Sequence, residues 1–191
     1  MRSTLLLCSL LAAGAPALAQ ASRRTYLHEA RDQAPEAPGL LEELEGGAAE
    51  GDAQRAARAA DRLLELTMDG ARASALVEAG PHRFQGLRAA VLERIGRLPP
   101  AAREALAGLQ DQGARGLRLG DRAAPTELLA RRYPCARDGR EALLELMGRA
   151  LEVGAQGRAR ALRARLLAVH PEAQGDLRLG AHEAFLALLT G

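Results

Sequence analysis

Histidine and cysteine are the side chains of this sequence best suited to metal binding or nucleophilic catalysis. A zinc protease needs the pattern His-Glu-x-x-His, which puts two ligands on one face of a helix. His28-Glu29 and His182-Glu183 both lack the second histidine. The four histidines are far apart in the sequence, whereas metal sites need clustered ligands. We therefore expect surface or capping roles for the histidines and no metal site.

Cys135 is the candidate nucleophile. It follows Tyr133-Pro134 in a predicted turn between helices, and Arg131, Arg132 and Arg137 are close to it in sequence. Positive neighbours favour a thiolate, but catalysis also needs a base, and no base is identifiable from the sequence. A P-loop is excluded because the chain has no Lys, and the glycines match no dinucleotide fingerprint. The sequence predicts a structural thiol, no cofactor and no enzymatic activity, with a Cys135-dependent enzyme as an alternative.

Arginine is the third residue type of interest, because its planar fork pairs well with carboxylates. Arg158, Arg160, Arg163 and Arg165 form a dense basic patch, with Arg149 nearby. Such a patch is ordinarily a solvated helix face, but it also suits an acidic protein or peptide, and we take Arg149, Arg160 and Arg163 as candidate contacts. The formal net charge is only +2, so nucleic acid is not an expected partner.

The elements that must position these side chains are helices. Aromatic residues make up 2% of the chain and Ile95 is its only isoleucine, whereas the helix formers Leu, Ala, Arg and Glu dominate. An all-α fold of antiparallel helical pairs follows. Apolar spacing and capping signals, among them Asp52 and a capping box at Asp138, predict a set of helices. They cover residues 39–45, 52–69, 82–97, 100–112, 125–133, 139–154, 157–169 and 173–189.

The N-terminus has the pattern of a secretory signal peptide over residues 1–19. Arg2 supplies the positive charge, residues 5–13 are apolar, and Ala17-Leu18-Ala19 predicts a cut between Ala19 and Gln20. No later segment is apolar for long enough to span a bilayer. We expect a periplasmic or secreted protein with no integral membrane segment after cleavage. Residues 20–38, which are polar and interrupted by proline, are expected to form a flexible arm.

Residues 141–171 carry a regular series of large and small side chains. The series is Leu144, Met147-Gly148, Leu151, Gly154 at a turn, the small Ala159 and a closing Pro171. It resembles a tetratricopeptide repeat, although the turn is one residue short and Arg163 replaces the usual aromatic residue. The Met147-Gly148 pair recurs as Leu179-Gly180. The resemblance implies a short solenoid of helical pairs over residues 99–191, after an N-terminal helical segment at 39–98.

A wider resemblance covers most of the chain after the signal peptide. It rests on four short motifs, which are Leu76-Val77-Glu78, Leu98-Pro99-Pro100, Leu119-Gly120-Asp121 and Arg132-Tyr133-Pro134. Together they look like the helical N-terminal region of exported bacterial proteins that end in a PQQ-like β-propeller. The propeller itself is not present in this sequence, so nothing about quinone binding carries over.

The last segment, residues 184–189, is apolar on every side. Repeat arrays need a terminal cap with a polar outer face, so Phe185 and Leu188 are candidate contacts for a partner or for another copy of the chain. The sequence thus predicts an exported helical-repeat module for protein–protein interaction. The alternative is an orphan N-terminal helical region of a larger propeller protein.

Overall fold

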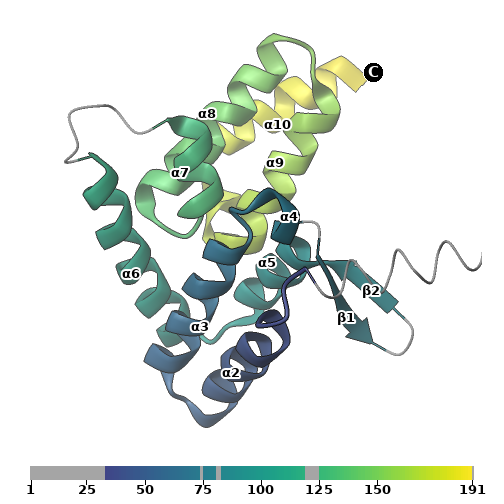
Figure 1. The fold of residues 1–191 in the computed structure, drawn as a ribbon. Helices are drawn as coiled ribbons and strands as arrows, with labels where there is room; N and C mark the ends of the chain where they lie inside the picture. Colours follow the sequence, from purple (N-terminus) through teal and green to yellow (C-terminus); the bar gives the residue numbers. More distant parts are fainter. Residues whose placement is uncertain (1–32, 74, 81–82, 119–124, 191) are drawn as a thin grey trace, which may run out of the picture.

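The protein is mostly helical in the computed structural model, which describes residues 33–73, 75–80, 83–118 and 125–190 (Figure 1). This confirms the predicted helical class. The signal peptide, most of the predicted arm and the Leu119-Gly120-Asp121 motif lie outside these residues. The helices are α2 (Ala37–Glu50), α3 (Ala53–Leu66), α4 (Gly70–Ala73), α5 (Leu87–Arg97), α6 (Pro100–Arg118), α7 (Thr126–Arg132), α8 (Arg137–Glu152), α9 (Gln156–Val169) and α10 (Leu177–Thr190), with a 3-10 turn η1 (Pro171–Gly175) before α10.

A short β-hairpin, which the sequence did not predict, interrupts the otherwise helical fold. Strands β1 (Leu76–Gly80) and β2 (Arg83–Gly86) pair antiparallel, with Val77 opposite Gln85. The helix predicted over residues 82–97 therefore begins only at Leu87. Its first turn was predicted wrongly because Phe84 and Leu87 have a spacing that suits a helix as well. Backbone pairing in the hairpin replaces the helical turn expected there. The Leu87 N–H closes the hairpin by donating to the Ala75 carbonyl at 2.8 Å.

Helix α2 is longer than predicted because the glycines at its centre do not end it. A Cβ atom on Gly47 would lie 2.8 Å from the backbone nitrogen of Ala56 in α3. Gly47 therefore serves close packing of the two helices, and the turn falls at Gly51, whose φ of 77° is in the left-handed region. The helix also begins at Ala37, inside the predicted arm, and Ala37 is buried.

Helix α3 has a packed side made mostly of alanine. Asp52 caps it as predicted, accepting the Arg55 N–H at 2.9 Å. Four alanines and two leucines of α3 are buried between α2 and α6. Each buried leucine contributes about 1.5–3 kcal/mol of transfer free energy, whereas the alanines contribute mainly by letting the helices approach.

Two predicted boundaries in the C-terminal half are wrong. Helix α8 begins at Arg137, not at Gly139, and has no side-chain cap, so the predicted capping box does not start it. A Cβ atom on Gly139 would lie 1.8 Å from the Tyr133 carbonyl oxygen, which shows how tightly the α7–α8 turn folds over the first turn of α8. The single helix predicted over residues 173–189 is η1 followed by α10. Asp176 separates them, accepting the Arg178 N–H at 2.8 Å and pairing with Arg140 at 2.5 Å.

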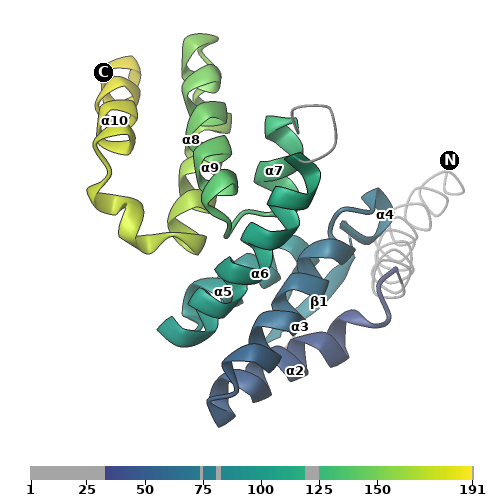
Figure 2. The same cartoon turned by 90° about the vertical axis from the view of Figure 1, so that its left-hand side faces the viewer.

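Helix α2 lies at one end of the molecule and α10 at the other (Figure 2). Helix α5 crosses α9 so closely that a Cβ atom on Gly96 would lie 2.5 Å from the Ala168 carbonyl oxygen. Helix α6 packs on α3 and on α8, and α8 packs on α7, α9 and α10. Within the described part of the chain, no helix has the length and apolar character needed to cross a membrane.

Candidate functional site

The structure places two of the three candidate arginines beside the C-terminal helix. Arg160 and Arg163 of α9 line a shallow hollow with Glu183, Leu186 and Ala187 of α10. Arg163 Nε lies 2.5 Å from Glu183 Oε1, which ties the two helices together. Arg160 is exposed and forms no ion pair with any residue that the structure describes. Arg160 is therefore the arginine of this hollow whose charge is available to a partner.

Arg149, the third candidate, lies elsewhere. It pairs with Glu145 one turn earlier on α8, and both side chains are exposed. Such an i,i+4 pair on a helix surface is worth only about 0.3–0.5 kcal/mol, so it leaves Arg149 free to exchange partners. The structure does not bring Arg149 into the hollow between α9 and α10.

Helix α10 has one face packed on the protein and one face bare. Leu179 is buried and Leu186 is half-buried, and α10 lies against α8. On the opposite side Leu177 is 90% exposed, Leu188 80% and Phe185 46%. Most of the exposed residues between them are small and uncharged, namely Gly180, Ala181, Ala184 and Ala187. The exception is Arg178, which pairs with Glu141 of α8. A surface helix ordinarily turns charged residues to solvent, so a face that exposes three large apolar side chains and a single arginine is unusual.

The residues of the predicted repeat occupy interior and turn positions. Leu144, Met147, Leu151 and Ala159 are all buried. A Cβ atom on Gly148 would lie 3.3 Å from Nε2 of His182 in α10, so Gly148 sits where α10 approaches α8. Gly154, with φ of 71°, makes the α8–α9 turn at the predicted place, and Pro171 opens η1 directly after α9.

Cys135 shares a pocket with His170. The pocket has a volume of about 330 Å³ and includes Arg103 and Glu172 in its lining. The imidazole is not directed at the sulfur, because Nε2 bonds to the Pro134 carbonyl at 2.8 Å and Nδ1 to Glu172 at 3.0 Å. Burial, followed by the charge of Asp61, raises the pKa of the Cys135 thiol to about 12. Cys135 is thus a buried thiol whose nearest histidine is held by other partners.

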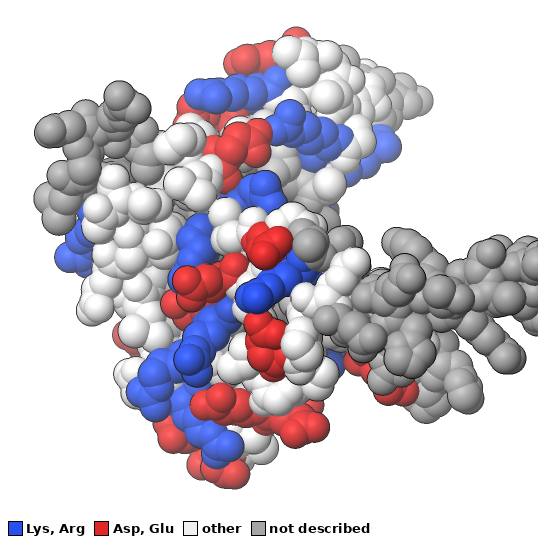
Figure 3. Space-filling model, viewed as in Figure 1, with Lys and Arg blue, Asp and Glu red and all other residues white. Residues whose placement is uncertain are grey.

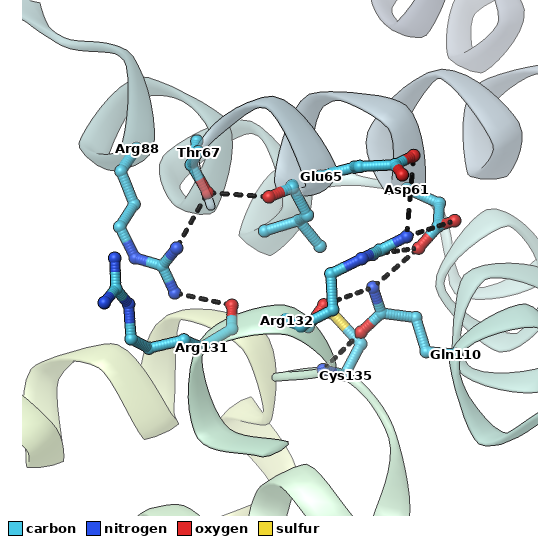
Figure 4. Close-up of polar contacts among 9 residues, drawn as sticks. Asp61, Glu65, Thr67, Arg88, Gln110, Arg131, Arg132 and Cys135 are labelled. Atoms are coloured by element: carbon cyan, nitrogen blue, oxygen red, sulfur yellow. Dashed lines mark hydrogen bonds and ion pairs between the residues drawn. The ribbon is translucent and has the colours of Figure 1, made fainter. Parts of the chain in front are cut away.

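A polar network that sequence reasoning missed joins α3, α6 and α7 (Figure 4). Arg132 donates to both carboxylate oxygens of Asp61, at 2.8 and 3.2 Å. The buried Gln110 donates to Asp61 at 2.9 Å and accepts the Cys135 N–H at 3.0 Å. Burial alone would lower the pKa of Arg132, but the bond to Asp61 and its charge raise it overall. The network holds the α7–α8 turn against the first half of the protein.

Arginines from three helices gather at the carboxyl end of α7. Arg88 of α5 donates to Thr67 Oγ1 at 2.7 Å and to the Arg131 carbonyl at 2.8 Å. Arg165 of α9 donates to the Ala130 carbonyl. Burial and then the charge of Arg131 lower the pKa of Arg88 to about 10. Burial and then the charges of Arg88 and Arg131 lower the pKa of Arg165 to about 9.

No group of three or more histidine, cysteine or carboxylate side chains is placed to hold a metal ion among the residues described. Comparison with known proteins finds no matching family model, no matching curated protein and no matching solved structure. The resemblances to tetratricopeptide repeats and to the helical region of propeller proteins therefore stay predictions, and a function has to be argued from the surfaces themselves.

Replacing Gln110 tests the polar network. The Gln110→Ala change leaves the Cys135 N–H without its acceptor, and we expect a loss of about 2–3 kcal/mol in the free energy of unfolding. Urea denaturation followed by circular dichroism measures this loss. Gln112→Ala, on the exposed side of the same helix, should change stability by less than about 0.5 kcal/mol. Equal losses for the two variants would contradict the role of the network.

Alkylation of Cys135 tests the alternative of a Cys-dependent enzyme. A pKa raised from 9.0 to about 12 makes the thiolate scarce, so reaction with iodoacetamide at pH 8 should be about a thousandfold slower in the native protein than in urea. Because the pKa is raised, native reactivity should stay low through pH 9 and increase only at higher pH. Mass spectrometry of the Cys135 peptide measures both rates. Rapid native alkylation at neutral pH would revive the enzyme hypothesis.

Proposed function

We propose that this protein is a helical-repeat module that binds another protein through the bare face of α10 and has no catalytic activity of its own. The observation that carries the proposal is the exposure of Leu177, Phe185 and Leu188 along one side of a helix whose other side is packed. Exposed apolar patches on otherwise well-packed proteins commonly mark interaction sites. Covering this face would remove three large apolar side chains from water.

The packing of α8, α9 and α10 supports the interpretation as a short solenoid. In a repeat array the helices of one unit stack on those of the next. Helices α8 and α9 form an antiparallel pair, and α10 lies against α8 as the first helix of a following unit would. The small Gly148 at this contact recurs as Gly180 on α10, where it is exposed. A partner helix could therefore approach α10 closely at Gly180, as α10 approaches α8 at Gly148.

The expected partner is a protein with an amphipathic helix that carries a carboxylate at the edge of its apolar face. The apolar side would lie along α10, where small residues allow close approach, and the carboxylate would meet Arg160. Arg160 suits this role because it is exposed and unpaired among the described residues, and because arginine binds carboxylates with two parallel bonds. On the face seen in Figure 3, arginine and acidic side chains are mixed, which offers nucleic acid no continuous positive surface.

We further propose that the module works in the periplasm or outside the cell. This proposal rests on the signal-peptide pattern of residues 1–19. A buried cysteine and a core built from Leu and Ala are compatible with a protein inside or outside the cytoplasm. The signal-peptide pattern alone therefore supports the proposed export.

A charge placed on the bare face tests the proposed function. Tagged protein would be used to capture partners from the envelope extract of its source, beside a Leu188→Glu variant. We expect a partner that the wild type retains and that Leu188→Glu loses by at least about tenfold, because an unpaired carboxylate is then buried in the contact. Quantitative mass spectrometry of the captured proteins measures the difference.

Ala49→Glu is the matched control, because Ala49 is an exposed apolar residue on α2 at the other end of the molecule (Figures 1 and 2). This variant should capture as the wild type does. Enrichment of the same proteins by all three forms would contradict the proposed face. Recovery of untagged copies of this chain that Leu188→Glu abolishes would identify the occupant as a second copy.

A further inference from the structure

The arginine cluster at the carboxyl end of α7 consists of Arg88, Arg131 and Arg165. Its three positive charges are not balanced by ion pairs with the described carboxylates. Figure 4 shows the guanidinium groups of Arg88 and Arg131 side by side. Arg165 is placed beside them by its bond to the Ala130 carbonyl, one residue before Arg131. The cluster draws its members from α5, α7 and α9, so the fold itself assembles it.

Among the residues that the structure describes, no carboxylate forms an ion pair with this cluster. Ten other arginines of the described residues form ion pairs with Asp or Glu, whereas none of these three does. Glu127 is close enough to act on Arg165 electrostatically, but its carboxylate is paired with Arg158. The Arg131 side chain is exposed and makes no hydrogen bond in the described structure. Like charges are therefore held together with solvent access on the Arg131 side.

The contacts of the cluster leave donors free. Arg88 donates to Thr67 and to the Arg131 carbonyl, and Arg165 donates to the Ala130 carbonyl. These bonds fix the two guanidinium groups at the negative end of the α7 dipole. Arg165 Nε is buried and has no hydrogen-bond partner among the residues described. A guanidinium has five N–H donors, so several of them are unused in each group.

We propose that Arg88, Arg131 and Arg165 form a binding site for a doubly charged oxyanion of the phosphate class. Three guanidinium forks offer more donors than the two oxygens of one carboxylate can accept. A phosphate group presents more oxygens and a charge of about −1.5 to −2 at neutral pH. Its binding would relieve the repulsion among three like charges that the protein's own carboxylates leave in place. This site is separate from the bare face of α10 and does not depend on it.

The test is the thermal stability of the full chain in inorganic phosphate at constant ionic strength, with chloride as the balancing ion. We expect the melting temperature to rise with phosphate and to saturate, because an anion that binds only the folded state stabilises it by mass action. Acetate, which is singly charged, should have no saturable effect. Phenyl phosphate tests whether the site binds a phosphate group carried on a larger molecule. Tighter binding of phenyl phosphate than of inorganic phosphate would establish this.

Arg131→Gln is the variant of choice, because the Arg131 side chain is exposed and makes no hydrogen bond or ion pair with the described residues, so the protein should fold normally. We expect it to lose the saturable phosphate effect, whereas Arg115→Gln, an exposed arginine of α6, should keep it. Shifts of the Arg88 and Arg165 Nε–H resonances on phosphate addition provide a second readout. An equal response in the wild type and Arg131→Gln, or an equal effect of acetate, would overturn the proposal.

Discussion

The shortage of large side chains constrains everything else in this structure. With 2% aromatic residues, the core has to be built from Leu and Ala, and interiors reach their normal packing density only when such helices approach closely. Glycine makes this possible at two crossings, Gly47 against Ala56 and Gly96 against Ala168, where a single added carbon would meet backbone atoms. Stability therefore depends on the fit of backbones more than on a few large anchors.

Close packing also brings helix ends against neighbouring helices, and their carbonyl groups find donors there. Helix α7 is the clearest case, because the carbonyls of Ala130, Arg131 and Arg132 accept from Arg165, Arg88 and Gln110 in turn. Long arginine side chains reach such carbonyls from neighbouring helices. These arginines also concentrate positive charge at one place, so the satisfied carbonyl groups and the proposed phosphate site have the same origin.

The sequence predicted what local pattern controls and missed what distant residues decide. Helix class, the Asp52 cap and the Gly154 turn follow from neighbours in sequence. The hairpin was missed because residues 82–87 fit a helix locally, and only pairing with β1 decides otherwise. The Asp61–Arg132 pair could not be predicted, since 71 residues separate its members. The burial of Gln110 could have been predicted, because Gln110 falls at a four-residue step between Leu106 and Ala114, which are buried. No pattern in the sequence indicated that Arg88, Arg131 and Arg165 would cluster.

The bare face of α10 is where pattern and structure meet, since the uniformly apolar segment 184–189 belongs to a helix that packs on one side alone. Photo-crosslinking tests the proposed role of this face most directly. A benzophenone amino acid would replace Phe185 in the source organism, with the similarly exposed Phe84 of the hairpin as the control position. We expect one dominant crosslinked protein from position 185 that is absent from position 84. No crosslink from position 185, or the same products from both positions, would contradict it.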